Sequence, residues 1–116
     1  AQNPTTGSLT TTSASFVDVT NTAVVVVPVL TAKVLINVAA VILNGVATAD
    51  SRLQLVRDST PLELTRQQFP DPNSREVINM TYIDTLTPGS HTYKVQAMTN
   101  NNLTVERCRV TVLMIE

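Results

Sequence analysis

The sequence TYIDTLTPGSHTYKVQAMT, residues 81–99, predicts two β-strands joined by a tight turn. Polar and apolar residues alternate on both sides of Pro88-Gly89, which is the period of a strand whose two faces meet different surroundings. Proline at the first central position of a type II turn fixes φ, and glycine at the second supplies the positive φ that this turn requires. We therefore expect an antiparallel hairpin, with strands at 76–84 and 91–98.

The composition favours β-structure along the whole chain. The 116 residues include 18 Thr and 17 Val, and both residue types are restricted at χ1 and favoured on pleated surfaces. No segment carries a sustained period of 3.6 residues, so no helix is expected. Turn signals separate about seven or eight short segments of strand character, which predicts a single all-β sandwich domain.

Two of the predicted strands are apolar on both faces. They are KVLINVAAVIL at 33–43 and the apolar part of VERCRVTVLMIE at 105–116. An antiparallel sheet commonly packs one face on the core and leaves the other face polar. We therefore expect the second apolar faces to be covered by another subunit, and the residues assigned to this interface are Leu35, Ile36, Val41, Leu113 and Ile115.

The first twelve residues, AQNPTTGSLTTT, are polar and uncharged. Such a segment has little apolar area to bury. Two interpretations stay open: a flexible extension of a domain at 13–116, or a connector that orders as an added strand on a neighbouring subunit. The connector residues would be Thr5, Thr6, Leu9 and Thr10. Because the chain starts at Ala1 rather than Met, we also expect that a preceding segment was removed.

Charge and hydropathy argue against two classes of partner. The net charge is −1 and no cluster of Lys and Arg follows a path along which a phosphate backbone could lie. The longest apolar run, AVVVVPVL at 23–30, is too short for a membrane span and contains Pro28. We expect neither nucleic-acid binding nor membrane insertion. The single cysteine, Cys108, excludes an internal disulfide and is predicted to be a small buried side chain.

No constellation of residues predicts catalysis, a metal site or a cofactor. The single histidine, His91, has Ser90 beside it and Asp84 across the turn, but neighbours along a strand point to opposite faces. A small hydrolase built on His91 is therefore the least favoured function. The segment DPNSRE at 71–76 offers alternating oxygen ligands, yet Arg75 lies among them and the glycine of a sharp calcium loop is missing.

Residues 59–75 are predicted to be the longest irregular region, with at most a short strand at 62–64. Pro61, Pro70 and Pro72 lie within it, and proline removes a ladder hydrogen bond. This region and the turn at 99–104 are the candidate loops for an alternative function, recognition of a surface glycan or receptor. The aromatic content of 3% counts against that alternative.

Three stretches of residues 52–116 form one pattern: LQLVRDSTPL at 53–62, YIDTLTPGSHTYKVQA at 82–97 and RVTVLMIE at 109–116. In this order they resemble the jelly-roll domains of phage tail-fibre and bacterial spore-surface proteins, which are similar in shape to the complement/tumour-necrosis-factor-like fold. The residues that match the family's pattern are Arg57, Tyr82, Asp84, Thr85, Pro88, His91, Tyr93 and Glu116.

This resemblance implies an antiparallel jelly-roll β-sandwich of about eight strands. It further implies a non-enzymatic structural subunit that assembles with itself, as a trimer or filament. The assembly would be an extracellular fibre, a spore-surface layer or a virion tail structure. No catalytic residue and no cofactor follow from it.

Overall fold

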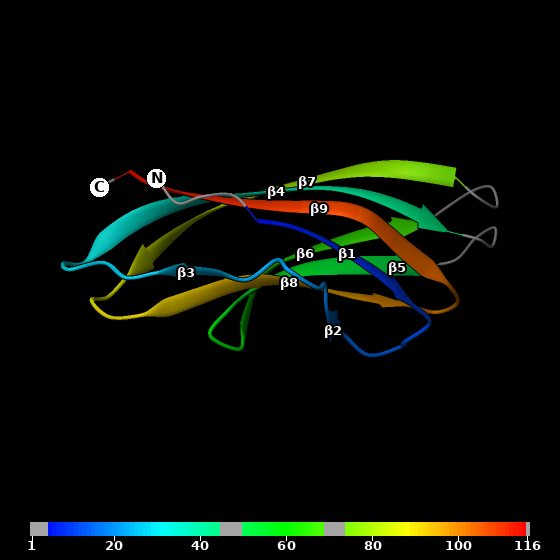
Figure 1. The fold of residues 1–116 in the computed structure, drawn as a ribbon, viewed down its shortest axis with the longest axis horizontal. Coiled ribbons are helices and arrows are strands. Elements are labelled where there is room, and N and C mark those ends of the chain that lie inside the picture. Colours follow the sequence, from blue (N-terminus) through cyan, green and yellow to red (C-terminus); the bar gives the residue numbers. More distant parts are fainter. Residues whose placement is uncertain (1–4, 45–49, 69–73, 116) are drawn as a thin grey trace.

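The computed structural model describes residues 5–44, 50–68 and 74–115, and these form two antiparallel β-sheets packed as a sandwich (Figure 1). Sheet I has the strand order β1-β9-β4-β7. Sheet II has the order β2-β8-β5-β6, and β3 also pairs with β8. The strands are β1 Thr5–Thr11, β2 Val17–Asp18, β3 Val24–Val26, β4 Ala32–Asn44, β5 Asp50–Arg57, β6 Thr60–Gln68, β7 Ser74–Leu86, β8 His91–Thr99 and β9 Leu103–Met114.

The prediction of an all-β sandwich is confirmed, with nine strands and no helix in the described part of the chain. The chain passes repeatedly from one sheet to the other, since β4, β7 and β9 belong to sheet I while β5, β6 and β8 belong to sheet II. The two predicted strands are present as β7 and β8, and Gly89 between them has the expected positive φ of 116°. The expected hairpin is wrong, because β7 pairs with β4 in sheet I and β8 pairs with β5 in sheet II, so the turn crosses from one sheet to the other. The turn dipeptide Asn44-Gly45 leads into 45–49, outside the described residues.

The core lies between the sheets and is aliphatic except for Tyr93. Strand β4 pairs with β7 on one side and β9 on the other, so its side chains alternate strictly between the core and the outer face. Its inward residues are nearly or fully buried, and they are Val34, Ile36, Val38, Ala40 and Ile42. The single cysteine is part of the same core, which confirms its prediction as a buried side chain.

Strand β6 corrects the prediction of an irregular region at 59–75. Residues Thr60–Gln68 pair with β5 along their whole length. A two-residue turn at Asp58 and Ser59, with φ of 48° and 76°, joins the two strands, as in the turns whose twist suits a hairpin. Pro61 is tolerated because β6 is the edge strand of sheet II and because Pro61 lies next to a shift of register.

The segment predicted to be an extension or connector contains the edge strand β1. Residues Thr5–Thr11 pair antiparallel with β9 of the same chain, so Thr5, Thr6, Leu9 and Thr10 all lie in this ladder. Leu9 packs against the core cluster. Ser8 also bridges to Thr20, in the segment between β2 and β3, and this contact links sheet I to the side of sheet II.

Gly7 is the position at which β1 approaches that segment most closely. A Cβ atom added there would lie 1.7 Å from the carbonyl oxygen of Thr20, a backbone atom that cannot rotate away. We expect Gly7→Ala to lower the free energy of unfolding by about 1–3 kcal/mol, the usual range for overpacking. Urea denaturation measures this change, and Ser8→Ala at the neighbouring exposed position is the control. An unchanged midpoint for Gly7→Ala would show that β1 does not pack against Thr20.

Candidate functional site

Asp84 of β7 joins the two sheets through a buried polar cluster. Arg57 of β5 and the hydroxyl of Tyr93 of β8 both donate to its Oδ2, the latter at 2.8 Å. The backbone N–H of Thr85 donates to its Oδ1 at 3.0 Å. The carboxylate raises the pKa of the Arg57 guanidinium through its hydrogen bond, and burial raises the pKa of Tyr93. Four of the residues that carry the family resemblance therefore meet in one structural cluster.

Removing this carboxylate should destabilise the sandwich strongly. Asp84→Ala leaves the Arg57 charge and the Tyr93 hydroxyl without their acceptor, and we expect a loss of about 3 kcal/mol of unfolding free energy. The control is Asp18→Ala, which removes an exposed ion pair with Lys94 and should cost no more than about 1 kcal/mol. Equal losses for the two variants, measured by urea denaturation, would contradict a stabilising role for the cluster.

Each ring nitrogen of His91 contacts an acceptor, and the two contacts connect two turns. Its Nδ1 lies 2.7 Å from Oδ2 of Asp58, in the turn between β5 and β6. Its Nε2 lies 2.8 Å from the carbonyl oxygen of Thr87, in the turn between β7 and β8. Both contacts need a donating N–H, so they favour the imidazolium form. The hydrogen bond with Asp58 is the main cause that raises the pKa of His91, followed by the bond to Thr87.

The grouping needed by a hydrolase is not assembled around this histidine. Asp84 contacts Arg57 and Tyr93 rather than His91. Both ring nitrogens of His91 are used by Asp58 and Thr87, and no hydrogen bond joins the ring to Ser90 in the described structure.

The raised pKa of His91 predicts a pH dependence of stability. A group whose pKa is higher in the folded state stabilises fully below its unfolded value of about 6.5, and this contribution is lost as the pH rises through the folded value. We expect the unfolding free energy of the protein, relative to that of His91→Gln, to fall as the pH rises from about 6.5 through the raised pKa of His91 in the folded state. Urea denaturation of both proteins across this range measures the difference. A constant difference would mean that His91 is not held as a cation.

No metal or redox chemistry is suggested by the described residues. They contain no group of three His, Cys, Asp or Glu side chains that could hold a metal ion. Burial raises the pKa of the Cys108 thiol to about 12, so it remains protonated. Asp71 and Asn73 of the weak calcium pattern lie outside the described residues. No helix in the described part of the chain is long and apolar enough to cross a membrane.

The outer face of sheet I carries an exposed apolar row. Leu35 of β4 lies between Ile83 of β7 and Leu113 of β9 in the sheet register. Ile83 is 60% exposed and Leu113 is 41% exposed, whereas Leu35 is partly covered. Ile115 is also exposed, and its backbone N–H donates to the carbonyl of Lys33 and so extends the ladder beside the row. We call Leu35, Ile83 and Leu113 the apolar row.

Of the five predicted interface residues, four are available to a partner. Leu35, Val41, Leu113 and Ile115 are partly or well exposed. Ile36 is fully buried in the core, because it has the opposite parity on β4, so its assignment to an interface is corrected. Val41 pairs with the exposed Val77 further along the same face.

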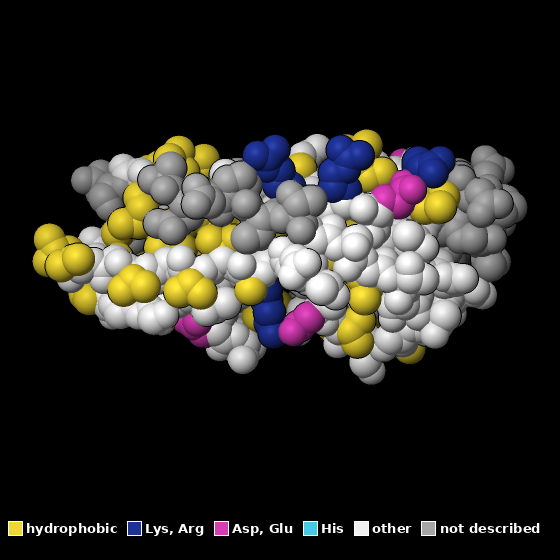
Figure 2. All heavy atoms as spheres, in the orientation of Figure 1, with side chains coloured by type: hydrophobic (Ala, Val, Ile, Leu, Met, Phe, Trp, Pro, Cys, Tyr) yellow, Lys and Arg dark blue, Asp and Glu magenta, His cyan; other side chains and the backbone are white. Residues whose placement is uncertain are grey.

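Positively charged side chains lie on the same outer face. Arg109 is paired with Ala39 in register and Arg107 with Val41, and both side chains are exposed. Lys33 lies two residues before the apolar row on β4. Arg75 forms an ion pair with Glu106 at 2.7 Å, but no salt bridge of Lys33, Arg107 or Arg109 occurs among the described residues. Figure 2 shows basic side chains gathered over this side of the molecule.

A second exposed apolar surface was missed by the sequence reasoning. Val25 and Val27 are exposed along the β3 edge, and Val29 and Leu30, 87% and 76% exposed, protrude in the connection to β4. We call these four residues the apolar edge. The sequence signal for this surface is the run AVVVVPVL at 23–30, which is apolar at every position. Pro28 places such a strand at a sheet edge, so the side chains that point away from the core stay exposed.

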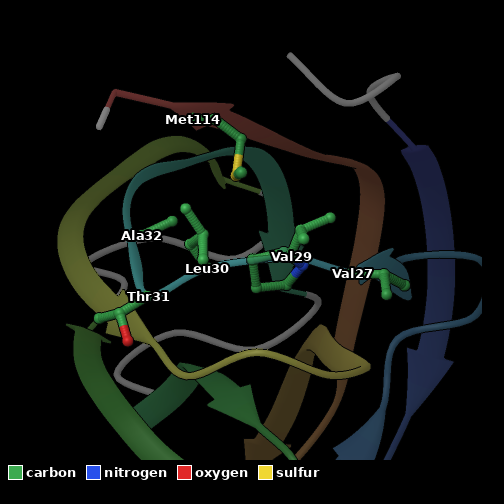
Figure 3. Close-up of a pocket in the computed structure, with 7 residues that line it drawn as sticks. Val27, Val29, Leu30, Thr31, Ala32 and Met114 are labelled. Atoms are coloured by element: carbon green, nitrogen blue, oxygen red, sulfur yellow. The ribbon is translucent and has the colours of Figure 1, made fainter.

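An open pocket of about 490 Å³ lies at the end of this edge. Val27, Leu30 and Ala32 line it from the β3–β4 side, and Met114 closes it from the end of β9 (Figure 3). Its walls are almost entirely aliphatic, with Thr31 as the polar side chain. Such a pocket is suited to aliphatic groups rather than to a polar substrate.

No protein-family model matches this sequence, and no curated protein matches it. Among solved structures, the chain is similar to Eiger TNF from S. frugiperda, with a TM-score of 0.63, 11% identity, and coverage of 97% of this chain and 92% of that one. It is also similar to the insecticidal delta-endotoxin Cry8Ea1 from Bacillus thuringiensis, with a TM-score of 0.56 and 12% identity, over 94% of this chain but only 20% of that one. At such identities the likeness shows the fold, and the expected jelly-roll sandwich is confirmed.

Proposed function

We propose that this chain is a non-enzymatic structural subunit that associates with copies of itself through the outer face of sheet I. The observation that carries the proposal is the apolar row, in which Ile83 and Leu113 are exposed and Leu35 is partly exposed, although the core is complete without them. Contiguous apolar surface beyond the needs of the core marks interaction sites on soluble proteins.

The polar residues support the same proposal, because they are used to stabilise the fold. Asp84 is satisfied by Arg57, Tyr93 and a backbone N–H. His91 is held between two turns. The clusters that sequence inspection would select for chemistry thus have internal partners, whereas the exposed aliphatic side chains have none.

The form of the assembly follows from the resemblance described above. A trimer or a filament is proposed, in an extracellular fibre, a spore-surface layer or a virion tail structure. The likeness to Eiger TNF supports a jelly-roll module of this size, since each chain covers almost all of the other. The exterior location rests on the resemblance of residues 52–116.

The alternative, a tip module that binds a glycan or receptor, has less support. Its main candidate loop was 59–75, and Thr60–Gln68 of that segment is a strand paired with β5. The described pocket is aliphatic, while sugar recognition uses convergent polar groups and stacked rings.

Charging the apolar row should dissociate the assembly. We expect the unmodified chain to have the mass of a trimer or larger by light scattering, and Ile83→Lys to have that of a monomer, because a lysine buried in an apolar interface would lose its hydration. Ile83 is well exposed, so its substitution should change the unfolding free energy by no more than about 0.5 kcal/mol.

Asn101→Lys is the matched control, because it adds the same charge at an exposed residue in the turn between β8 and β9. It should retain the mass of the unmodified chain. A monomeric unmodified protein, or an Ile83→Lys variant of unchanged mass, would refute self-association through this face.

A further inference from the structure

The charges around the apolar row disfavour its contact with the same row of another copy. A stable interface buries about 800 Å² on each partner, far more than three side chains provide. A face-to-face contact of that size would include Arg107, Arg109 and Lys33 of both copies. A twofold contact repeats one surface patch on each side, so the interface would enclose two sets of these cations, and their desolvation would be unfavourable.

The apolar edge has the properties that the outer face of sheet I needs in a partner. Residues 19–32 contain no charged side chain, so apart from Lys33, which follows them directly, this segment offers no like charge to the cations that border the apolar row. In the described structure β3 pairs with β8 alone, so one edge of this strand keeps unpaired backbone groups. Its carbonyl oxygens are acceptors for arginine and lysine donors.

The two surfaces are also arranged for side-by-side packing. Leu30 precedes Leu35 by five residues, and Met114 follows Leu113 directly, so the apolar edge and the apolar row approach the same end of the sandwich. The aliphatic pocket opens between them, with Leu30 and Met114 in its wall (Figure 3). This pocket has room for a branched aliphatic side chain from a neighbouring copy.

We infer that the subunits pack heterologously, with the apolar row of one copy covering the apolar edge of the next. The partner of the row is thus a second copy of this chain, presenting Val25, Val27, Val29 and Leu30. This inference rests on the proposed self-association. Each copy offers one row and one edge, so the contact can repeat head to tail from copy to copy. Such a series closes into a ring or continues as a filament.

Two variants with complementary defects test the arrangement. Ile83→Lys removes the row and keeps the edge, while Leu30→Lys removes the edge and keeps the row. Each variant alone should be monomeric by sedimentation velocity. Mixed in equal amounts, they should form a dimer of one copy each, because only one intact row and one intact edge can meet.

Methyl NMR locates the contact even when the single interface is weak. With Ile83→Lys labelled and Leu30→Lys added, the signals of Val27 and Leu30 in the labelled chain should shift. Addition of unlabelled Ile83→Lys instead should leave them unchanged, and Asn101→Lys should assemble like the unmodified chain.

The outcomes separate the two proposals. An unmodified chain that stays monomeric refutes self-association itself. An assembling unmodified chain whose Leu30→Lys variant also assembles refutes only the heterologous contact, and so do two monomeric variants whose mixture shows neither a dimer nor shifted edge signals.

Discussion

The double pairing of β4 is the constraint on which the rest of the structure depends. Its thirteen residues lie between β7 and β9, and each inward position is filled by an aliphatic side chain. A shift of one residue would exchange the two faces of the strand. Because β4 is largely apolar on both faces, hydrophobic burial alone specifies this register weakly. Polar ties must therefore contribute, and they include the bond from Asn37 to Thr81 on the outer face at 3.3 Å and the Asp84 cluster between the sheets.

The same argument explains why the polar residues that carry the resemblance can serve to stabilise the fold rather than to take part in a reaction. Asp84 fixes β7 against β5 and β8, and His91 fixes the turn before β8 against the turn after β5. Each of these hydrogen-bonded contacts joins segments that are not paired with each other in the sheets. A sandwich with an aliphatic core has few directional contacts between its layers, so a few charge-assisted hydrogen bonds select one alignment from many of similar packing.

Alternation of residue types predicted the strands that have one core face, and Pro88-Gly89 predicted the turn between β7 and β8. That these two strands belong to different sheets, rather than to one hairpin, was not visible in the local pattern. Residues 1–12 were expected to be an extension or a connector strand on a neighbouring subunit, and 59–75 to hold at most a short strand. The structure has β1 and the longer β6 there, and both are edge strands, where less burial is needed and the pattern is weak. Ile36 was assigned to the wrong face because β4 is apolar on both faces. Alternation along its sequence therefore does not show which side chains point into the core. The Asp84 cluster joins residues 27 and 9 positions apart in different sheets, and local pattern carries no information on such contacts.

The reactivity of the buried Cys108 thiol can report local opening of the structure. In the ladders of sheet I this residue lies between Gly7 of β1 and Ala40 of β4, and its side chain is fully buried. A thiol with a pKa of about 12 reacts with alkylating reagents only after the surrounding structure has opened. Labelling kinetics of the unmodified protein therefore report the transient opening of the structure around Cys108, and comparison with the rate of global unfolding shows whether this part of the sandwich opens as a separate unit.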